Sequence, residues 1–423
     1  MKHALRTLTL ALVAGPLGSA ALGTAHAQQR VELDFWTFYL SPKFDDYIRG
    51  VIAAFERQNP GIKVNYIDKQ GTLEQEFITS VALGSVPDVV NLWVESTQKA
   101  ADSGLLTDMT AAVGPGLRSL YYPNSLSNFT VNGRVYGLPW YASFNAGVMA
   151  YNNDLIRRAG VTALPKTTAQ MAAFARQVKA RTGAYGWAPA IKDPQGGTFL
   201  GVFVGEGLPI LRGNQAAFGT PAHARLLQTY IDLYRSDVIP QDLLRKEAFQ
   251  LSQELYTQGK LATIIGGPQA LNRVKDNNRA IYAASQVTMA PVGAGKTEAG
   301  SGMSLVVPKA SSHPKEALLF ARFMTNRANQ VAFAKIVPVV PTAAGSDRDP
   351  YFAQIRSSRD PIERATGMIA ANGANLKTAI PPLKNPTDMF KAFDDNIEAA
   401  FLGRKTAQQA LNDAATAWNA LMK

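Results

Sequence analysis

The chain has 423 residues, of which 46% are hydrophobic and 18% are charged, and its formal net charge is +11. This composition excludes a disordered chain, and because hydrophobic cores stop growing at about 250–300 residues we expect two lobes. The sequence has no cysteine, which excludes disulfides, thiolate metal sites and cysteine nucleophiles. Lys and Arg form no run of five or more, so we read the positive charge as a solvated surface and expect no nucleic-acid partner.

The first 27 residues have the pattern of a secretory signal. An apolar stretch from Leu8 to Leu22 follows two basic residues, and Ala25-His26-Ala27 has the small-x-small form of a signal-peptidase site. The stretch is shorter than the roughly 20 residues of a membrane-spanning helix. We therefore expect residues 1–27 to be removed as a signal peptide. Because Gln28 stands where a lipoprotein would need a cysteine, we expect a periplasmic protein without a lipid anchor.

The next 65 residues predict three strands joined by two helices. The strand patterns lie at 31–35, 62–66 and 87–92. The first helix has apolar residues at helical spacing over 44–55, and the second is expected to begin with a capping box of Thr72 and Gln75 and to end at Gly84.

Strand–helix–strand units of this kind build parallel sheets through right-handed crossovers. Ligands of open α/β sheets bind beyond the carboxyl ends of the strands. We therefore expect the loops at 36–40, 68–72 and 93–96 to converge on one cleft.

A second α/β region is expected after residues 136–141. One helix begins with a capping box of Thr167 and Gln170, another begins at Thr220-Pro221, and a strand is expected at 261–265. The chain ends in a predicted helical pair, 390–402 and a helix opened by a Thr406–Gln409 capping box, with Gly403 between them.

Four motifs have a chemical interpretation that their surroundings do not support. Residues 290–297 fit a loose phosphate-binding loop, but loop composition follows where a helix is needed. Tyr121-Tyr122 lacks neighbouring metal ligands, so we expect ordinary core or surface tyrosines. Adjacent Asp394-Asp395 predicts a solvated helix face and no hydrolase pair. His223 and His313 are expected on the surface, too far apart in sequence to suggest a triad.

Aromatic residues give the stronger signal. Trp36, Phe38 and Tyr39 lie where the first strand is expected to end, and Trp93 follows the third strand. Aromatic rings at strand ends offer flat apolar faces to the C–H surfaces of sugars. We expect at least one of these rings to contact a ligand.

Several segments, taken in order, resemble the extracellular solute-binding proteins of ABC importers, in their carbohydrate-binding group. The resemblance spans nearly all of 30–423 and rests on residues 55–64, 84–90, 136–139, 148–155, 164–168, 259–268, 302–308, 312–317 and 400–411. It implies an α/β, two-lobed periplasmic-binding-protein-like fold of the type II class, with a ligand cleft between the lobes. The implied lobes are 28–143 with 302–341, and 144–301 with 342–423.

The resemblance also implies contact positions. They fall on Trp93, Glu95, Asn145, Gln269 and Phe390, and Gly302 is placed with them at the return to the first lobe. Gln269 stands where a stacking Trp is frequent in the family. The implied partners are a carbohydrate and the transmembrane permease subunits of an importer.

The implied function is delivery of a carbohydrate, an oligosaccharide in particular, to a permease, by a monomer that needs no cofactor or metal and is not an enzyme. Amide and carboxylate groups such as Glu95, Asn145 and Gln269 can pair sugar hydroxyls, which are costly to bury unpaired. Two alternatives remain: a binder of an anionic ligand such as a glycerophosphodiester, and a secreted glycoside hydrolase.

The signal pattern makes a prediction about the mature protein. Protein extracted from the cell envelope should begin at Gln28 and carry no lipid, because Ala25-His26-Ala27 directs cleavage and no cysteine is present. Intact mass spectrometry measures this directly. Retention of Met1, or the added mass of a diacylglycerol, would contradict the prediction.

Overall fold

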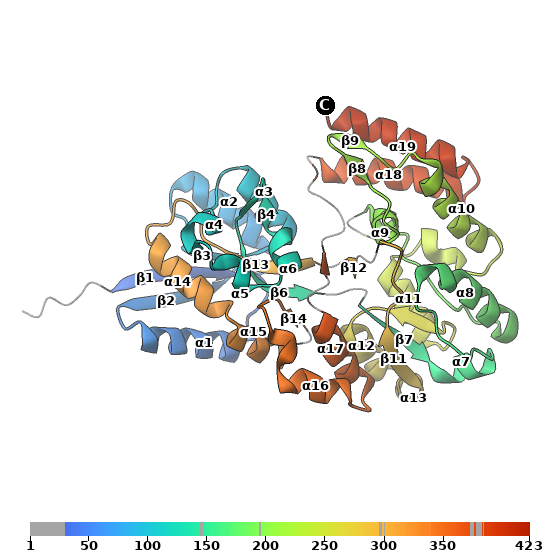
Figure 1. Ribbon diagram of the computed structural model, residues 1–423, viewed down its shortest axis with the longest axis horizontal. Coiled ribbons are helices and arrows are strands. Elements are labelled where there is room, and N and C mark those ends of the chain that lie inside the picture. Colours follow the sequence, from blue (N-terminus) through green and yellow to red (C-terminus); the bar gives the residue numbers. More distant parts are fainter. Residues whose placement is uncertain are drawn as a thin grey trace, which may run out of the picture.

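The computed structural model describes residues 30–143, 147–193, 196–295, 298–299, 301–337, 339–372, 376–377, 383 and 385–423. These residues form two α/β lobes that lie side by side in Figure 1. The expected signal peptide lies outside this set. Within the described ranges, no helix combines the length and the apolar character needed to cross a membrane.

A six-stranded sheet forms the first lobe, in the order β14-β6-β13-β3-β1-β2. Its strands are β1 (Val31–Thr37), β2 (Ile62–Asp68), β3 (Val89–Trp93), β6 (Leu138–Ser143), β13 (Ser301–Val306) and β14 (Val340–Pro341). Strand β1 pairs in parallel with both β2 and β3, which confirms the predicted strand–helix–strand units. Strand β13 runs antiparallel to both of its neighbours, β3 and β6, so it joins the two halves of the sheet.

Helices cover both faces of this sheet. They are α1 (Asp45–Gln58), α2 (Leu73–Leu83), α3 (Val94–Asp102), α4 (Met109–Val113), α5 (Leu117–Leu120), α6 (Pro123–Asn128), α14 (Pro314–Met324) and α15 (Arg327–Ala334), with a small β4 (Thr130–Val131) and β5 (Arg134–Val135) hairpin. Alternate residues of β1 point to opposite faces. Phe35 packs edge-on against Phe320 of α14, whereas Trp36 packs on the other face with Leu73 and Phe77 of α2.

The second lobe is built on a three-stranded antiparallel sheet, β10-β7-β11. Its strands are β7 (Val148–Asn152), β10 (Thr263–Ile265) and β11 (Ser285–Met289). The surrounding elements are α7 (Asn153–Arg158), α8 (Thr168–Thr182), α9 (Thr198–Gly205), β8 (Leu211–Arg212), β9 (Gln215–Ala216), α10 (Pro221–Arg235), η2 (Gln241–Leu244), α11 (Ala248–Thr257), α12 (Pro268–Asn277), α13 (Arg279–Ala283), α18 (Pro386–Phe401) and α19 (Ala407–Leu421). A large apolar core joins α8, α9 and α10 to α18 and α19.

A helical segment contacts both lobes. It comprises η3 (Ser346–Arg348), α16 (Pro350–Arg356) and α17 (Pro361–Asn372). Phe352 and Ala370 pack with Val331 of α15, while Ala365 and Ile369 pack with the second sheet. A second link is the short parallel pair of β12 (Glu298–Ala299) with β15 (Leu376–Lys377), and β15 lies against α6.

The predicted capping boxes of Thr167 and Thr406 are confirmed, and Gly84 and Gly403 end their helices in the left-handed conformation. The capping box predicted at Thr72 is wrong. A 3-10 turn, η1 (Gln70–Thr72), precedes α2, so the Thr72 backbone is already helical and its hydroxyl donates to Lys69 O and Glu76 Oε1.

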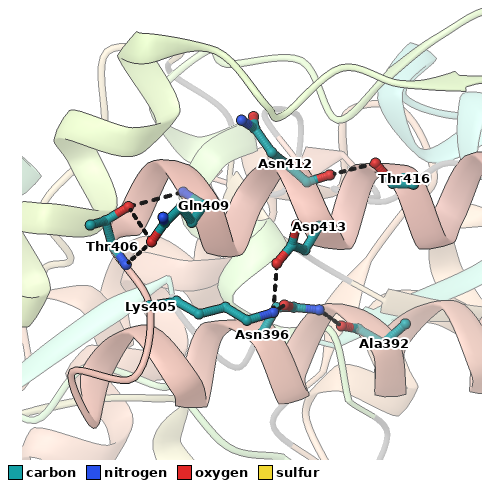
Figure 2. Close-up of polar contacts among 8 residues, drawn as sticks. All are labelled: Ala392, Asn396, Lys405, Thr406, Gln409, Asn412, Asp413 and Thr416. Atoms are coloured by element: carbon teal, nitrogen blue, oxygen red, sulfur yellow. Dashed lines mark hydrogen bonds and ion pairs between the residues drawn. The ribbon is translucent and has the colours of Figure 1, made fainter.

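The two C-terminal helices are tied together by polar contacts as well as by their core. The Lys405 ammonium donates to Asn396 Oδ1 of α18 at 2.6 Å and to Asp413 Oδ2 of α19 at 2.7 Å (Figure 2). Figure 2 also shows the Thr406–Gln409 box that begins α19. Because this lysine lies between both helices, it fixes the turn at the point where the chain reverses.

One buried amide connects the last strand of the first sheet to its helices. The Gln330 Nε2 donates to Pro139 O at 3.0 Å and to Thr325 O at 2.7 Å. Its Oε1 accepts from Thr342 N at 2.5 Å and from Ala343 N at 3.1 Å. The side chain therefore pairs backbone groups of three segments that would otherwise be buried without partners.

Replacing Gln330 with Leu should lower the free energy of unfolding by about 2–4 kcal/mol, because it leaves these four backbone groups unpaired in the core. Chemical denaturation measures the change. Gln58→Leu, at the exposed end of α1, is the control and should change stability by less than about 0.5 kcal/mol. Equal stability of the two variants would contradict the role given to Gln330.

Candidate functional site

Two sheet edges face each other across the segments that cross between the lobes. In the first lobe, Ser301 at the start of β13 pairs with Ser143 at the end of β6, and Met303 pairs with Trp93 at the end of β3. The chain leaves this edge at Ser143 and returns to it at Ser301. The carboxyl ends of β3 and β6 therefore lie at the edge from which the second lobe is reached.

The matching edge of the second lobe contains the start of β7 and the ends of β10 and β11. Gly266, after β10, donates its N–H to Val148 O at 3.0 Å, and Ala290, after β11, donates to Gly147 O at 3.3 Å. The residues that follow β10 thus lie next to the point where the chain enters the lobe.

Three loops of the first lobe converge at its edge. The Phe38 and Tyr39 ring centroids are 4.7 Å apart, and those of Phe38 and Trp93 are 6.3 Å apart, both in edge-on geometry. The Tyr39 hydroxyl lies close to the loop at 68–72, where a Cβ at Gly71 would be 2.9 Å from the hydroxyl oxygen. Phe38, Tyr39 and Trp93 therefore form one aromatic cluster.

Tyr39 is the exposed member of this cluster. Its side chain is 59% exposed, whereas Phe38 and Trp93 are half-buried, and its φ of 51° lies in the left-handed region. Residues other than glycine adopt that conformation at a cost of about 1–3 kcal/mol, and such strain gathers at functional sites. The contacts with Phe38 and Gly71 help to hold it.

Trp36 is placed differently from the other aromatic residues of its loop. Its ring packs on the α2 side of the sheet, and its indole N–H is buried without a hydrogen-bond partner. The Lys69 ammonium lies 4.1 Å from the ring centroid and also pairs with the Glu76 carboxylate at 2.7 Å. One face of the Trp36 ring is therefore covered by a lysine that is itself ion-paired.

Two polar residues predicted for the site occupy equivalent places in the two lobes. Glu95 is exposed in the first turn of α3, two residues after Trp93, and Gln269 is exposed in the first turn of α12, directly after Pro268. Each follows a strand that ends at one of the facing edges. Asn145 lies outside the described residues.

Gly302 is buried within β13, and its role in the structure is one of close packing. A Cβ at this position would lie 2.6 Å from Tyr141 O of β6, far closer than real side chains approach. The residue thus allows β13 and β6 to approach beside the crossing segment.

Phe390 lies half-buried on α18 and packs against a glycine turn. Its ring centroid is 6.5 Å from that of Trp418, and a Cβ at Gly197 would lie 2.5 Å from Phe390 Cδ1. Gly196 and Gly197 both have positive φ, 77° and 67°. The ring therefore fits the turn only because no side chain is present at Gly197.

Asp394 follows Phe390 by one helical turn and was not among the residues predicted for the site. Its Oδ2 accepts from Gly197 N at 2.8 Å, and burial raises the pKa of its carboxyl to about 6, although the Gly197 N–H opposes this shift. The prediction of a solvated pair is wrong for Asp394, whereas Asp395 is exposed and pairs with Lys391 at 2.6 Å. The four-residue spacing from Phe390 was the available signal, since it places both on one helix face.

The remaining motifs have structural roles. Strand β12 begins at Glu298, so no helix follows residues 290–297, of which Lys296 and Thr297 lie outside the described set. Tyr121 is buried and bonded to Thr325 Oγ1 at 2.6 Å. In the residues that the structure describes, no group of three or more His, Asp or Glu side chains could hold a metal ion.

The surface prediction for the histidines is wrong for His223. This side chain is buried, with Nδ1 2.7 Å from Thr220 Oγ1 and Nε2 3.0 Å from Pro209 O, and burial lowers its pKa. His313 is partly exposed and lies 3.5 Å from Asp88 Oδ1.

Two α/β lobes, linked by crossing segments and presenting facing strand ends with an aromatic cluster, define a two-lobed binding protein. The chain belongs to the bacterial extracellular solute-binding protein family, whose model matches residues 41–331. Membership of this family of binding proteins places the chain outside the cytoplasm.

Individual relatives match over most of their length. The maltodextrin-binding protein MdxE of Bacillus subtilis (strain 168) is 24% identical over 397 residues, 89% of this chain and 88% of the relative. The galactooligosaccharide-binding protein of the same strain is 23% identical over 379 residues, 87% of this chain and 85% of the relative. A solved periplasmic-binding protein from Synechococcus sp. MITs9220 is 27% identical, with a TM-score of 0.78 over 92% of this chain and 98% of that chain.

The packing at Gly302 makes a prediction about stability. Gly302→Ala should lower the free energy of unfolding by about 1–3 kcal/mol, because the added methyl must displace the Tyr141 backbone. Gly61→Ala is the matched control, since a Cβ there meets nothing within 4 Å. Equal unfolding midpoints for both variants in urea would exclude the packing role.

Proposed function

We propose that the chain is the substrate-binding component of an ABC importer and that it binds a carbohydrate, specifically an oligosaccharide, between its lobes. The observation that carries the proposal is the cluster of Phe38, Tyr39 and Trp93 at the edge facing the second lobe. Sugars bind to such clusters because ring faces stack on C–H surfaces. The names of the maltodextrin- and galactooligosaccharide-binding relatives support this class of ligand.

The proposed contacts come from both lobes. In the first lobe they are Trp36, Phe38, Tyr39, Trp93 and Glu95, and in the second Asn145, Gln269 and Phe390, with Gly302 shaping the edge. Carboxylate and amide groups pair hydroxyls, which cost about 1–3 kcal/mol each when buried unpaired. A ligand that touches both lobes binds the closed arrangement better and shifts the population toward it.

We further propose that the mature protein is a monomer, is free in the periplasm, and delivers its sugar to permease subunits without transforming it. The family and the named relatives are binding proteins, which supports binding without catalysis. An anionic ligand is less well supported. At the strand ends, the Lys69 charge is already paired with Glu76 and lies over Trp36.

A thermal-shift screen tests the ligand class. The panel contains maltotetraose, galactotriose and a glycerophosphodiester, each at increasing concentration. Saturation at 100 times the dissociation constant adds about 2.7 kcal/mol of stability. A shift with an oligosaccharide and an unchanged concentration of that oligosaccharide after incubation support binding without hydrolysis. A shift with the glycerophosphodiester alone, or cleavage of the sugar, would overturn the proposal.

Substitution of the aromatic residues tests the site. Trp93→Ala and Phe390→Ala should each weaken binding of the oligosaccharide identified in the screen by about 1–3 kcal/mol, because each removes a ring face. Isothermal titration calorimetry measures the affinity. Phe249→Ala, a partly exposed ring at the start of α11, is the control and should leave it unchanged. A lower melting temperature with unchanged affinity would assign the substituted ring to the core.

A further inference from the structure

A carboxylate of α18 bonds to the turn beneath Phe390. Asp394 Oδ2 accepts from Gly197 N at 2.8 Å, and Gly196 N donates to Asp193 O at 3.0 Å. A Cβ at Gly196 would lie 3.0 Å from both Asp394 Oδ2 and Phe390 Cβ. The ring and the carboxylate therefore both lie against the same turn.

We propose that Asp394 is a positioning residue of the sugar site: its carboxylate holds the Gly196–Gly197 turn against Phe390 and so sets the orientation of that ring. This inference rests on the proposed function, because it assumes that Phe390 contacts the sugar. Asp394 itself acts through the turn and the ring.

The charge of Asp394 matters because of where the bond ends. Gly197 is the N-cap of α9, so its N–H lies at the positive end of a helix that begins at Thr198. A hydrogen bond to an ionised carboxylate is about twice as strong as one to a neutral acceptor. Protonation should therefore loosen the turn without removing the acceptor.

The surroundings set the pH at which this happens. Burial raises the pKa of the Asp394 carboxyl to about 6, and the negative charges of Asp395 on α18 and Asp193 before the turn contribute to this rise. The hydrogen bond from Gly197 N and the positive charge of Lys192 act in the opposite direction and lower this pKa. The pKa is about 3.8 in the unfolded chain and about 6 in the folded one, so the folded state binds this proton more tightly. The resulting stabilisation of the fold is fully present below pH 3.8 and is lost as pH rises through about 6.

The first test uses the mature protein without ligand. Asp394→Asn keeps an acceptor for Gly197 N and removes the charge, so its melting temperature should exceed that of the wild type at pH 7.5, with the difference shrinking toward pH 4. Asp395→Asn, which removes the neighbouring exposed charge paired with Lys391, is the control; because it keeps the Asp394 carboxyl, its melting temperature should follow that of the wild type across this pH range. Parallel profiles for all three proteins would overturn the role of the charge.

The second test measures affinity for maltotetraose and galactotriose by calorimetry between pH 5 and 8. Wild-type affinity should fall by about fivefold as pH drops through 6, whereas Asp394→Asn should have the lower affinity at pH 7.5 and approach that of the wild type at pH 5. Asp395→Asn should follow the wild type. Identical affinities for Asp394→Asn and wild type at pH 7.5 would overturn the inference.

A third variant tests the turn itself. Gly197→Ala should weaken binding by about tenfold or more, because its methyl displaces Phe390. Gly183→Ala has the same backbone cost, with φ at 74° and nothing within 4 Å, and should bind as the wild type does. If the two glycine variants bind with equal affinity, the inference about the turn is overturned but the proposed function is not. If the wild type binds neither sugar, the proposed function itself is overturned.

Discussion

The position of β13 is the constraint on which the rest of the structure depends. This strand lies between β3 and β6 and runs antiparallel to both, so its first residue must lie at the edge where β3 and β6 end. The chain therefore leaves β6 for the second lobe, and returns from it into β13, at that edge. Phe38, Tyr39 and Trp93 lie at this edge as well, since the parallel pairing of β1 with β3 brings their loops to it.

Features that depend on neighbouring residues could be predicted from the sequence. Alternating apolar residues located β1 and β2, and the Thr167 and Thr406 boxes marked their helix starts because the partner is three residues away. Thr72 has the same spacing to Gln75, yet its backbone is already part of η1. A capping motif specifies which hydrogen bonds are available, whereas the preceding backbone decides whether they form.

Features that depend on distant residues could not be predicted. Asp394 and Asp395 are chemically identical neighbours, but Asp394 bonds to Gly197 N, nearly two hundred residues earlier, whereas Asp395 is exposed and pairs with Lys391. The role of a glycine also depends on residues distant in the sequence. Gly293 lies within a crossing segment and suggests a flexible joint, but a Cβ there would lie 2.2 Å from Gly205 O, so the residue permits close backbone packing. The aromatic cluster could be predicted in part: the sequence identified its residues, but not which of their rings are in contact.

The insertion of the second lobe into the first also sets the order in which the molecule can fold. Strands β1, β2 and β3 can pair as soon as residue 93 is available, but β6 and β14 connect to them only through β13, which begins at Ser301. Leu305 pairs with Asn91 across more than two hundred residues. Such distant pairing slows folding, so a chain being threaded across a membrane would keep an unfinished first lobe until most of its length had emerged.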